Sequence, residues 1–132
     1  MTLNELRTII KEELEVDTTN LEGEVAKNCS LAQKYIDLLL REEKKLNVLQ
    51  KSHNILMGER FVHYKTKFDY LASTQKELMI YINGDKDVAM SNHKVRNQEV
   101  IINFLAKTVD NFKSRGFALK SLVDLVKFLS GE

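Results

Sequence analysis

Apolar residues recur every three or four positions along most of this chain, which is the spacing of one face of an α-helix. The longest such pattern runs from Leu21 to Leu56, a second covers residues 3–14, and a third runs from Ile102 to Val126. Proline, the strongest helix breaker, is absent from all 132 residues. The pattern therefore predicts an all-α protein built from long helices.

The first two predicted helices have recognisable start signals. Thr2, followed by Glu5 three residues later, has the spacing of a capping box. The apolar pattern is then interrupted at residues 16–19. The second helix is expected to be capped by one of three polar residues, Asp17, Thr18 or Thr19.

The pattern from Leu21 to Leu56 alternates steps of four and three residues, as the inner face of a coiled coil does. Three polar residues interrupt this seam, namely Asn28, Glu42 and His53. Such interruptions favour a helical hairpin within one chain over a parallel zipper. For His53 we favour a partly exposed seam position over a role as a ligand.

Residues 58–84 allow two interpretations. Their aromatic residues have helical spacing in one reading and strand alternation in the other, and periodicity alone does not separate the two. We favour a second long helix or a continuation of the preceding one over a short irregular or hairpin segment. The sequence Asn83-Gly84-Asp85 predicts a turn, and Asp85 and Asp87 suit the start of the helix that follows.

The C-terminal residues 117–129 are unusually apolar, with nine apolar residues among thirteen. A helix with so little polar surface is expected to be covered on several sides. Thirteen residues are too few to cross a bilayer, which takes about 20, so the cover is expected to be protein and not membrane. The residues expected to mediate homo-oligomerisation are Phe112, Gly116, Phe117, Leu119, Leu122, Val123, Val126 and Leu129.

Gly116 lies within the third apolar pattern and has two interpretations. If one helix continues through it, the missing side chain lets another backbone approach closely. If the helix ends there, Gly116 is a C-cap and Phe117 begins a new helix. We favour the C-cap.

The charges are unevenly distributed, although the net charge is only +1. Residues 1–24 hold two basic and seven acidic residues, whereas residues 41–67 hold seven basic and three acidic ones. Such asymmetry indicates a polyanion-binding face. The single cysteine, Cys29, cannot form an internal disulfide, and no N-terminal leader pattern is visible, so we expect an intracellular protein.

The sequence contains no recognisable catalytic or cofactor-binding pattern. The histidines and Cys29 lack zinc-site spacing, and neither a phosphate-binding loop nor a dinucleotide fingerprint is present. We therefore expect no enzymatic activity, no metal and no cofactor.

The segment from Arg60 to Tyr70 interleaves basic and aromatic residues. Single-stranded nucleic acid is bound by cations that contact phosphates and by rings that stack on bases. Composition alone favours the alternative, in which the rings are core residues and the lysines their solvated flank. The candidate nucleic-acid-binding residues are Arg60, Tyr64, Lys65, Lys67 and Phe68.

Three segments of the chain match the pattern of a known family, namely Asp17-Thr18-Thr19-Asn20-Leu21, Asp85-Lys86-Asp87-Val88 and Lys113-Ser114-Arg115-Gly116-Phe117-Ala118-Leu119-Lys120. Together they resemble the UvsY family, the recombination mediator proteins of T-even-like bacteriophages. The resemblance implies a single all-α domain, residues 1–132, with a DNA-binding part at 1–84 and an oligomerisation part at 85–132. It also implies a non-enzymatic factor that binds single-stranded DNA as a ring-like hexamer or heptamer.

The expected partners are a RecA-like phage recombinase and the phage single-strand-binding protein, in the cytoplasm of an infected bacterium. In this family a Lys-Ala-Arg segment contributes to DNA binding, and the matching residues here are Gly58, Glu59 and Arg60. Only the arginine is kept, and nearby Lys65 and Lys67 could supply the missing charge. A second, weaker DNA contact, or a helix-end role, is assigned to Lys113, Arg115 and Lys120. The alternative function is a coiled-coil protein-interaction module that binds no DNA.

Overall fold

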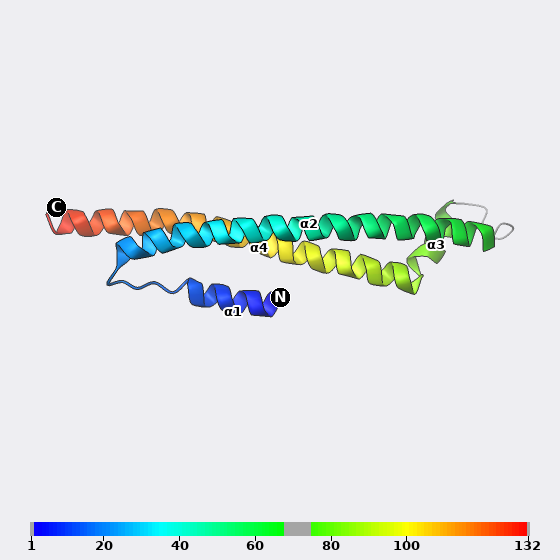
Figure 1. Cartoon of the computed structure of the whole chain (residues 1–132), viewed down its shortest axis with the longest axis horizontal. Helices are drawn as coiled ribbons and strands as arrows, with labels where there is room; N and C mark the ends of the chain where they lie inside the picture. Colours follow the sequence, from blue (N-terminus) through cyan, green and yellow to red (C-terminus); the bar gives the residue numbers. More distant parts are fainter. Residues whose placement is uncertain (1, 68–74, 132) are drawn as a thin grey trace. The chain divides into compact units, whose positions relative to one another are not determined.

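The structure, a computed structural model, describes residues 2–67 and 75–131. In these ranges it contains four helices (Figure 1). They are α1 (Leu3–Glu13), α2 (Leu21–Lys67), α3 (Gln75–Asn83) and α4 (Lys86–Leu129). Neither described range contains a β-strand. The prediction of an all-α fold is confirmed.

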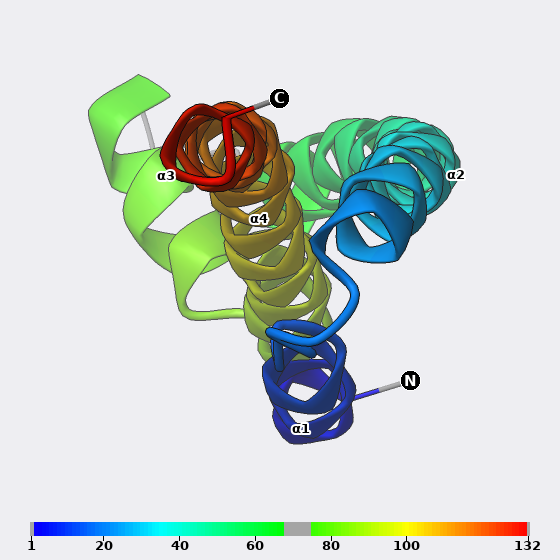
Figure 2. The same ribbon diagram turned by 90° about the vertical axis from the view of Figure 1, so that its left-hand side faces the viewer.

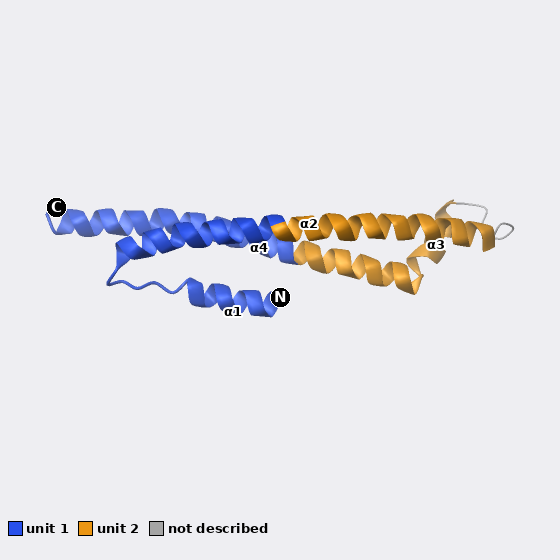
Figure 3. Cartoon of the chain, in the orientation of Figure 1, with its two compact units in different colours: residues 1–40, 101–132 blue, residues 41–100 orange. Residues whose placement is uncertain are grey.

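The chain forms two compact units, and each contains part of α2 and part of α4 (Figure 3). Unit 1 comprises residues 1–40 and 101–132, and unit 2 comprises residues 41–100. The boundary therefore falls inside the two long helices, whereas the expected DNA-binding and oligomerisation parts meet at the turn after residue 84. That functional division stays a prediction.

The core of unit 1 is formed by α1 and by the parts of α2 and α4 that belong to this unit (Figure 2). Each helix contributes at the spacing that its sequence predicts. The buried residues of this core are Leu6 and Ile10 from α1, Tyr35 from α2, and Leu105, Val109 and Phe112 from α4.

The pairing of α2 with α4 in unit 1 centres on Phe112, which is fully buried. Its ring stacks on that of Tyr35 with 5.3 Å between centroids, and its carbonyl oxygen accepts a 2.7 Å hydrogen bond from Asn28 Nδ2. This contact requires close approach, since a Cβ atom on Gly116 would lie 3.1 Å from Asn28 Nδ2. Gly116 therefore lies at a contact point inside α4.

The expectation that Gly116 caps a helix is wrong. α4 continues without a break from Lys86 to Leu129. The left-handed conformation of a glycine C-cap is absent at Gly116, because the only positive φ angle in residues 2–67 and 75–131 belongs to Gly131. The alternative interpretation, one helix with a close contact at Gly116, is confirmed.

The start of α1 agrees with its prediction, because Thr2 and Glu5 form both hydrogen bonds of a capping box. The prediction for α2 is wrong by one residue. Asn20 caps this helix through a 3.2 Å bond from the Gly23 amide to its Oδ1 atom. Asp17 instead accepts two hydrogen bonds from Thr19, which organise the turn before the helix.

Polar residues of the predicted seam are paired in unit 2. Gln98 Nε2 donates to the carbonyl oxygen and to the carboxylate of Glu42, at 2.9 and 2.6 Å. His53 Nδ1 lies 2.9 Å from Ser91 Oγ, and His53 is half-buried, as predicted. Because the partners on α4 descend in number as those on α2 rise, the two helices are antiparallel. The predicted helical hairpin is confirmed within this unit.

The interpretation of residues 58–84 as helical is confirmed where the structure describes them. Residues 58–67 complete α2, and residues 75–83 form α3. The predicted turn at Asn83-Gly84-Asp85 separates α3 from α4. Among the described residues of this segment, none is in a strand.

We expect Phe112→Ala to lower the free energy of unfolding by about 3–5 kcal/mol, because it leaves a cavity against Tyr35. Denaturant unfolding followed by circular dichroism measures this loss. Val100→Ala, at a half-exposed position of the same helix, is the control and should change stability by no more than about 0.5 kcal/mol. Equal losses in the two variants would contradict the assignment of Phe112 to the core.

Candidate nucleic-acid interface

Arg60 lies on α2 with its guanidinium directed at the start of α4. Its Nη2 atom is 2.6 Å from Asp87 Oδ2, and its Nε atom is 3.3 Å from Asp85 Oδ2. The Arg60 side chain is 29% exposed, whereas that of Asp87 is 65% exposed. The main candidate for phosphate binding is therefore already paired with carboxylates, one of them readily accessible to solvent.

Asp85 is the residue that joins α2 to the start of α4. Its Oδ1 atom accepts hydrogen bonds from the backbone amides of Asp87 and Val88, at 2.9 and 3.2 Å. Its Oδ2 atom accepts a 2.8 Å bond from the hydroxyl of Tyr64. The first two bonds are those of an N-cap, so the prediction that the acidic residues here belong to a helix start is confirmed.

The hydrogen bond between Tyr64 and Asp85 shifts both groups away from titration near neutral pH. It lowers the pKa of the Asp85 carboxyl, an effect that desolvation opposes and that the two backbone amides and Arg60 reinforce. The same bond raises the pKa of the Tyr64 hydroxyl. Asp85 therefore stays ionised and Tyr64 stays protonated, which keeps the contact intact.

Tyr64 also belongs to an aromatic cluster. Its ring lies 6.2 Å from that of Tyr81 in a stacked arrangement, with 22° between the ring planes. His63 approaches it edge-on at 5.0 Å. Part of the ring surface that the sequence assigns to base stacking is therefore occupied within unit 2.

The remaining residues of the predicted DNA-binding set lie at the end of α2. Lys65 and Lys67 are exposed in its last turn. Lys65 Nζ lies 5.9 Å from the centroid of the Phe61 ring. Phe68 lies outside the described residues. The structure thus places Arg60, Tyr64 and the two lysines within two turns of one helix.

Arg115, a candidate for a second DNA contact, is an internal anchor of unit 1. Its side chain is only 13% exposed. Its guanidinium donates to the carbonyl oxygens of Glu13 and Glu15, each at 3.2 Å, and lies 3.8 Å from the Glu24 carboxylate. Arg115 therefore has the helix-end role that was the alternative to a DNA contact. The helix end in question is the C-terminal end of α1, where unpaired carbonyl oxygens attract cations.

The two neighbouring candidates have a different environment from Arg115. Lys113 and Lys120 are exposed on α4 and line a groove of about 260 Å³ in unit 1. Cys29 is exposed at the same groove. Both lysines stay candidates for a secondary contact.

The residues expected to mediate oligomerisation fall into two groups. Phe112 and Leu119 are buried in the chain's own core, and Gly116 contacts Asn28, so these three stabilise the monomer. The others lie on a largely exposed part of α4, from Phe117 onward. Its exposed residues are Phe117, Leu122, Val126 and Leu129, together with Leu125 and Phe128, which the sequence prediction did not include.

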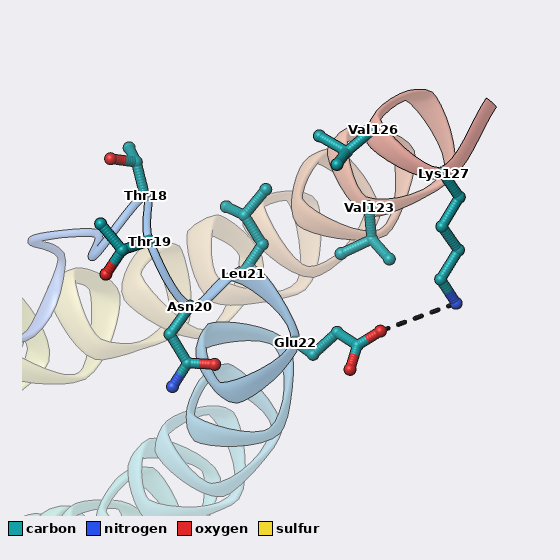
Figure 4. Close-up of a pocket in the computed structure, with 8 residues that line it drawn as sticks. All are labelled: Thr18, Thr19, Asn20, Leu21, Glu22, Val123, Val126 and Lys127. Atoms are coloured by element: carbon teal, nitrogen blue, oxygen red, sulfur yellow. Dashed lines mark ion pairs between the residues drawn. The ribbon is translucent and has the colours of Figure 1, made fainter. Parts of the chain in front are cut away.

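Val123 and Val126 also line a pocket of about 330 Å³ against the start of α2 (Figure 4). Leu21 lies on the opposite wall, and Lys127 Nζ is 3.6 Å from a carboxylate oxygen of Glu22. The last turns of α4 are therefore covered on one side by α2. The expectation of cover on several sides is not met within unit 1.

Sequence reasoning also missed a groove in unit 2. It lies along α2 and is lined by Arg41, Lys44, Lys45, Val48, Leu49 and Gln98. The excess of positive charge in residues 41–67 is the signal that could have found it, but only the fold shows that aliphatic side chains lie among the cations.

The described parts of the chain show no metal-binding constellation and no membrane-spanning element. In residues 2–67 and 75–131, no three His, Cys, Asp or Glu side chains gather closely enough to hold a metal ion. No helix in these ranges combines the length and the apolar character needed to cross a membrane. The described helices define the class as an all-α protein with an antiparallel helical hairpin, and cationic side chains lie at the end of α2 and along the groove at residues 41–49.

The family assignment follows from a match over residues 9–132 to the family described as "Recombination, repair and ssDNA binding protein UvsY". The chain belongs to this family, as the three motifs indicated. It is also 24% identical to the Recombination protein uvsY of Enterobacteria phage T4, over 100% of both chains. The expected membership of a recombination, repair and single-stranded DNA-binding family is thereby confirmed.

Solved structures agree with the fold. Crystal structures of the bacteriophage T4 recombination mediator protein UvsY are similar to this chain with TM-scores of 0.87 and 0.85, at 24% and 23% identity. They cover 97% and 94% of this chain, and this chain covers 98% of each. At such identity the likeness supports the all-α fold and not the individual site residues.

We expect the free energy of unfolding to fall as pH drops below about 4, the ordinary pKa of Asp. Because the folded state lowers the pKa of Asp85, its ionised form stabilises the fold above that pH, and the stabilisation is lost as pH falls through the lowered value. Denaturant titrations from about pH 2 to about pH 7 measure this loss.

Asp85→Asn should show a smaller loss on acidification than the wild type, because the titrating group is absent. Asp110→Asn, which removes an exposed carboxylate from α4, the helix that Asp85 caps, is the matched control and should retain the wild-type acid dependence. An unchanged acid dependence in Asp85→Asn would contradict the role assigned to this carboxylate.

Proposed function

We propose that this chain is a recombination mediator that binds single-stranded DNA and promotes loading of a RecA-like phage recombinase. The observation that carries the proposal is the family match over residues 9–132. The names of the similar T4 proteins, a recombination protein and a recombination mediator protein, support the same role. The mediator would act in the cytoplasm of an infected bacterium and help the recombinase displace the phage single-strand-binding protein.

DNA binding is assigned to the last two turns of α2. Arg60, Lys65 and Lys67 would contact phosphates there, and Tyr64 would contribute ring surface next to them. Phe68, which follows in the sequence, is assigned to the same set. A phosphate must compete with Asp85 and Asp87 for the guanidinium of Arg60, which makes the contact of a single subunit weak.

Assembly would compensate for this weakness. If copies associate into a hexamer or heptamer, several weak patches act on one strand, and their joint affinity exceeds that of one patch by orders of magnitude. The exposed apolar residues of α4 beyond Gly116 are the proposed assembly surface. Lys113 and Lys120 would lie beside it as a secondary DNA contact.

The alternative function is a helical protein-interaction module without DNA binding. The ion pairs of Arg60 are the observation that favours it, because an arginine held by two carboxylates has a structural role even in the absence of DNA. Enzymatic activity is not part of either proposal.

The test is the affinity for a labelled single-stranded oligonucleotide, measured by fluorescence anisotropy at increasing salt. We expect the wild type to bind and its affinity to fall as salt rises, because phosphate contacts release counterions. Arg60→Gln should bind more weakly. Gly58→Lys, which restores the family's lysine at a position with open space around it, should bind more tightly and steepen the logarithmic salt slope by about 0.7 per added contact.

Gly58→Ala is the matched control, because it stabilises the exposed helix position as lysine does but adds no charge. It should leave DNA affinity unchanged. If the wild type shows no binding at low salt while its oligomer is intact, the proposal of a DNA-binding mediator is wrong and the interaction module is favoured.

We expect the double variant Leu122→Lys/Leu129→Lys to sediment as a smaller species than the wild type, because it places charges on the proposed assembly surface. Sedimentation velocity measures the mass, and circular dichroism verifies that the helices are retained. Ser121→Lys, at an exposed polar position of the same helix, is the control and should keep the wild-type mass. Retention of that mass by the double variant would place the assembly contact elsewhere.

A further inference from the structure

The groove of about 510 Å³ in unit 2 combines an aliphatic floor with a cationic rim. The aliphatic residues of its lining, called its floor here, are Val48 and Leu49, and Val48 is 65% exposed. The cations that line the same groove, called its rim here, are Arg41, Lys44 and Lys45 of α2. An exposed aliphatic surface bordered by charge is typical of a site where another protein segment binds.

The contacts inside the groove leave its positive charge largely uncompensated. The carboxylate of Glu42 accepts from Gln98 at 2.6 Å and lies 3.2 Å from Lys45 Nζ, so this acid is already paired. Arg41 and Lys44 have no ion-pair partner in residues 2–67 and 75–131. A ligand for this groove should therefore be both apolar and anionic.

The groove is better suited to a peptide than to a nucleic acid strand. Binding of single strands relies on aromatic side chains that stack on bases, and none of the described residues that line this groove is aromatic. Its aliphatic floor matches aliphatic side chains of similar size instead.

Unit 1 carries a segment with the required chemistry, at Glu12–Asp17. Leu14 and Val16 are exposed there by 36% and 40%, so the segment presents aliphatic surface to solvent. The carboxylates of the segment that face solvent belong to Glu12, Glu15 and Asp17. α1 ends at Glu13, so the chain continues beyond it in a non-helical conformation that can enter a groove.

We propose that Glu12–Asp17 of one copy of this chain docks into the groove at residues 41–49 of a second copy. Leu14 and Val16 would cover Val48 and Leu49, while the carboxylates approach the cationic rim. The contact is heterologous, because the two surfaces differ and every copy carries both. Such contacts join copies head to tail and close into rings where the rotation permits. This surface is separate from the α4 surface and requires no DNA.

Charge reversal on either side of the contact tests the proposal in the full chain. Lys44→Glu and Glu15→Lys each place like charges opposite one another, so each should weaken self-association by about tenfold or more. Sedimentation velocity over a range of protein concentrations, at low salt and without DNA, measures the association. Lys94→Glu, which makes the same charge change at an exposed position of unit 2 outside the groove, should associate as the wild type does.

Mixing the two variants separates a contact between copies from any other effect. In an equimolar mixture of Lys44→Glu and Glu15→Lys chains, each groove can meet a segment of opposite charge on the other chain, so association should recover. A monomeric wild type, unchanged association of either variant, or a mixture that fails to recover would overturn the proposal.

Oligonucleotide binding is measured in parallel. Loss of binding by Lys44→Glu with unchanged association would identify the groove as a DNA contact and overturn the proposal while leaving the mediator function intact.

Discussion

The contact between Asn28 and Phe112 fixes how α2 and α4 pair in unit 1. The Asn28 amide reaches the Phe112 carbonyl oxygen, and the Phe112 ring stacks on Tyr35. A polar contact of this kind sets register, because a shift of either helix would leave a buried donor without an acceptor. The stack of rings adds about 0.5–1.5 kcal/mol beyond its burial, and the absence of a side chain at Gly116 makes the approach sterically feasible.

The docking of α1 depends on that pairing. Leu6 and Ile10 pack on the core that the two long helices create, and the Tyr35 hydroxyl donates to the Glu13 carboxylate at 2.6 Å. Burial raises the pKa of Tyr35, and the bond to Glu13 raises it further. Arg115 then holds the carbonyl oxygens at the end of α1. The acidic segment Glu12–Asp17, which begins in the last turn of α1, therefore has a defined position on unit 1.

In unit 2, the same principle of polar contacts on a helical seam positions the candidate DNA-binding residues. Asp85 caps α4 and accepts from Tyr64, and Arg60 bridges Asp85 and Asp87. Arg60 and Tyr64, which contribute charge and ring surface to the candidate DNA-binding set, thus also hold the start of α4. In the proposed function, a phosphate would have to compete with these internal contacts, and assembly into several copies would compensate for that competition.

The sequence by itself determined the helical class, the capping box at Thr2 and Glu5, the turn at Asn83-Gly84-Asp85 and the family. Those features depend on neighbours within a few residues or on a continuous apolar period, which are visible in one dimension. Only the tertiary structure decided that Gly116 lies inside a helix, that Phe112 belongs to the core and that the cationic groove has an aliphatic floor. It also decided that Arg115 is an internal anchor, because its partners lie 100 and 102 residues away in the sequence. Likewise, only the structure shows that Arg60 is paired, because Asp87 lies 27 residues away. The pattern of a single segment carries no information about contacts across such separations.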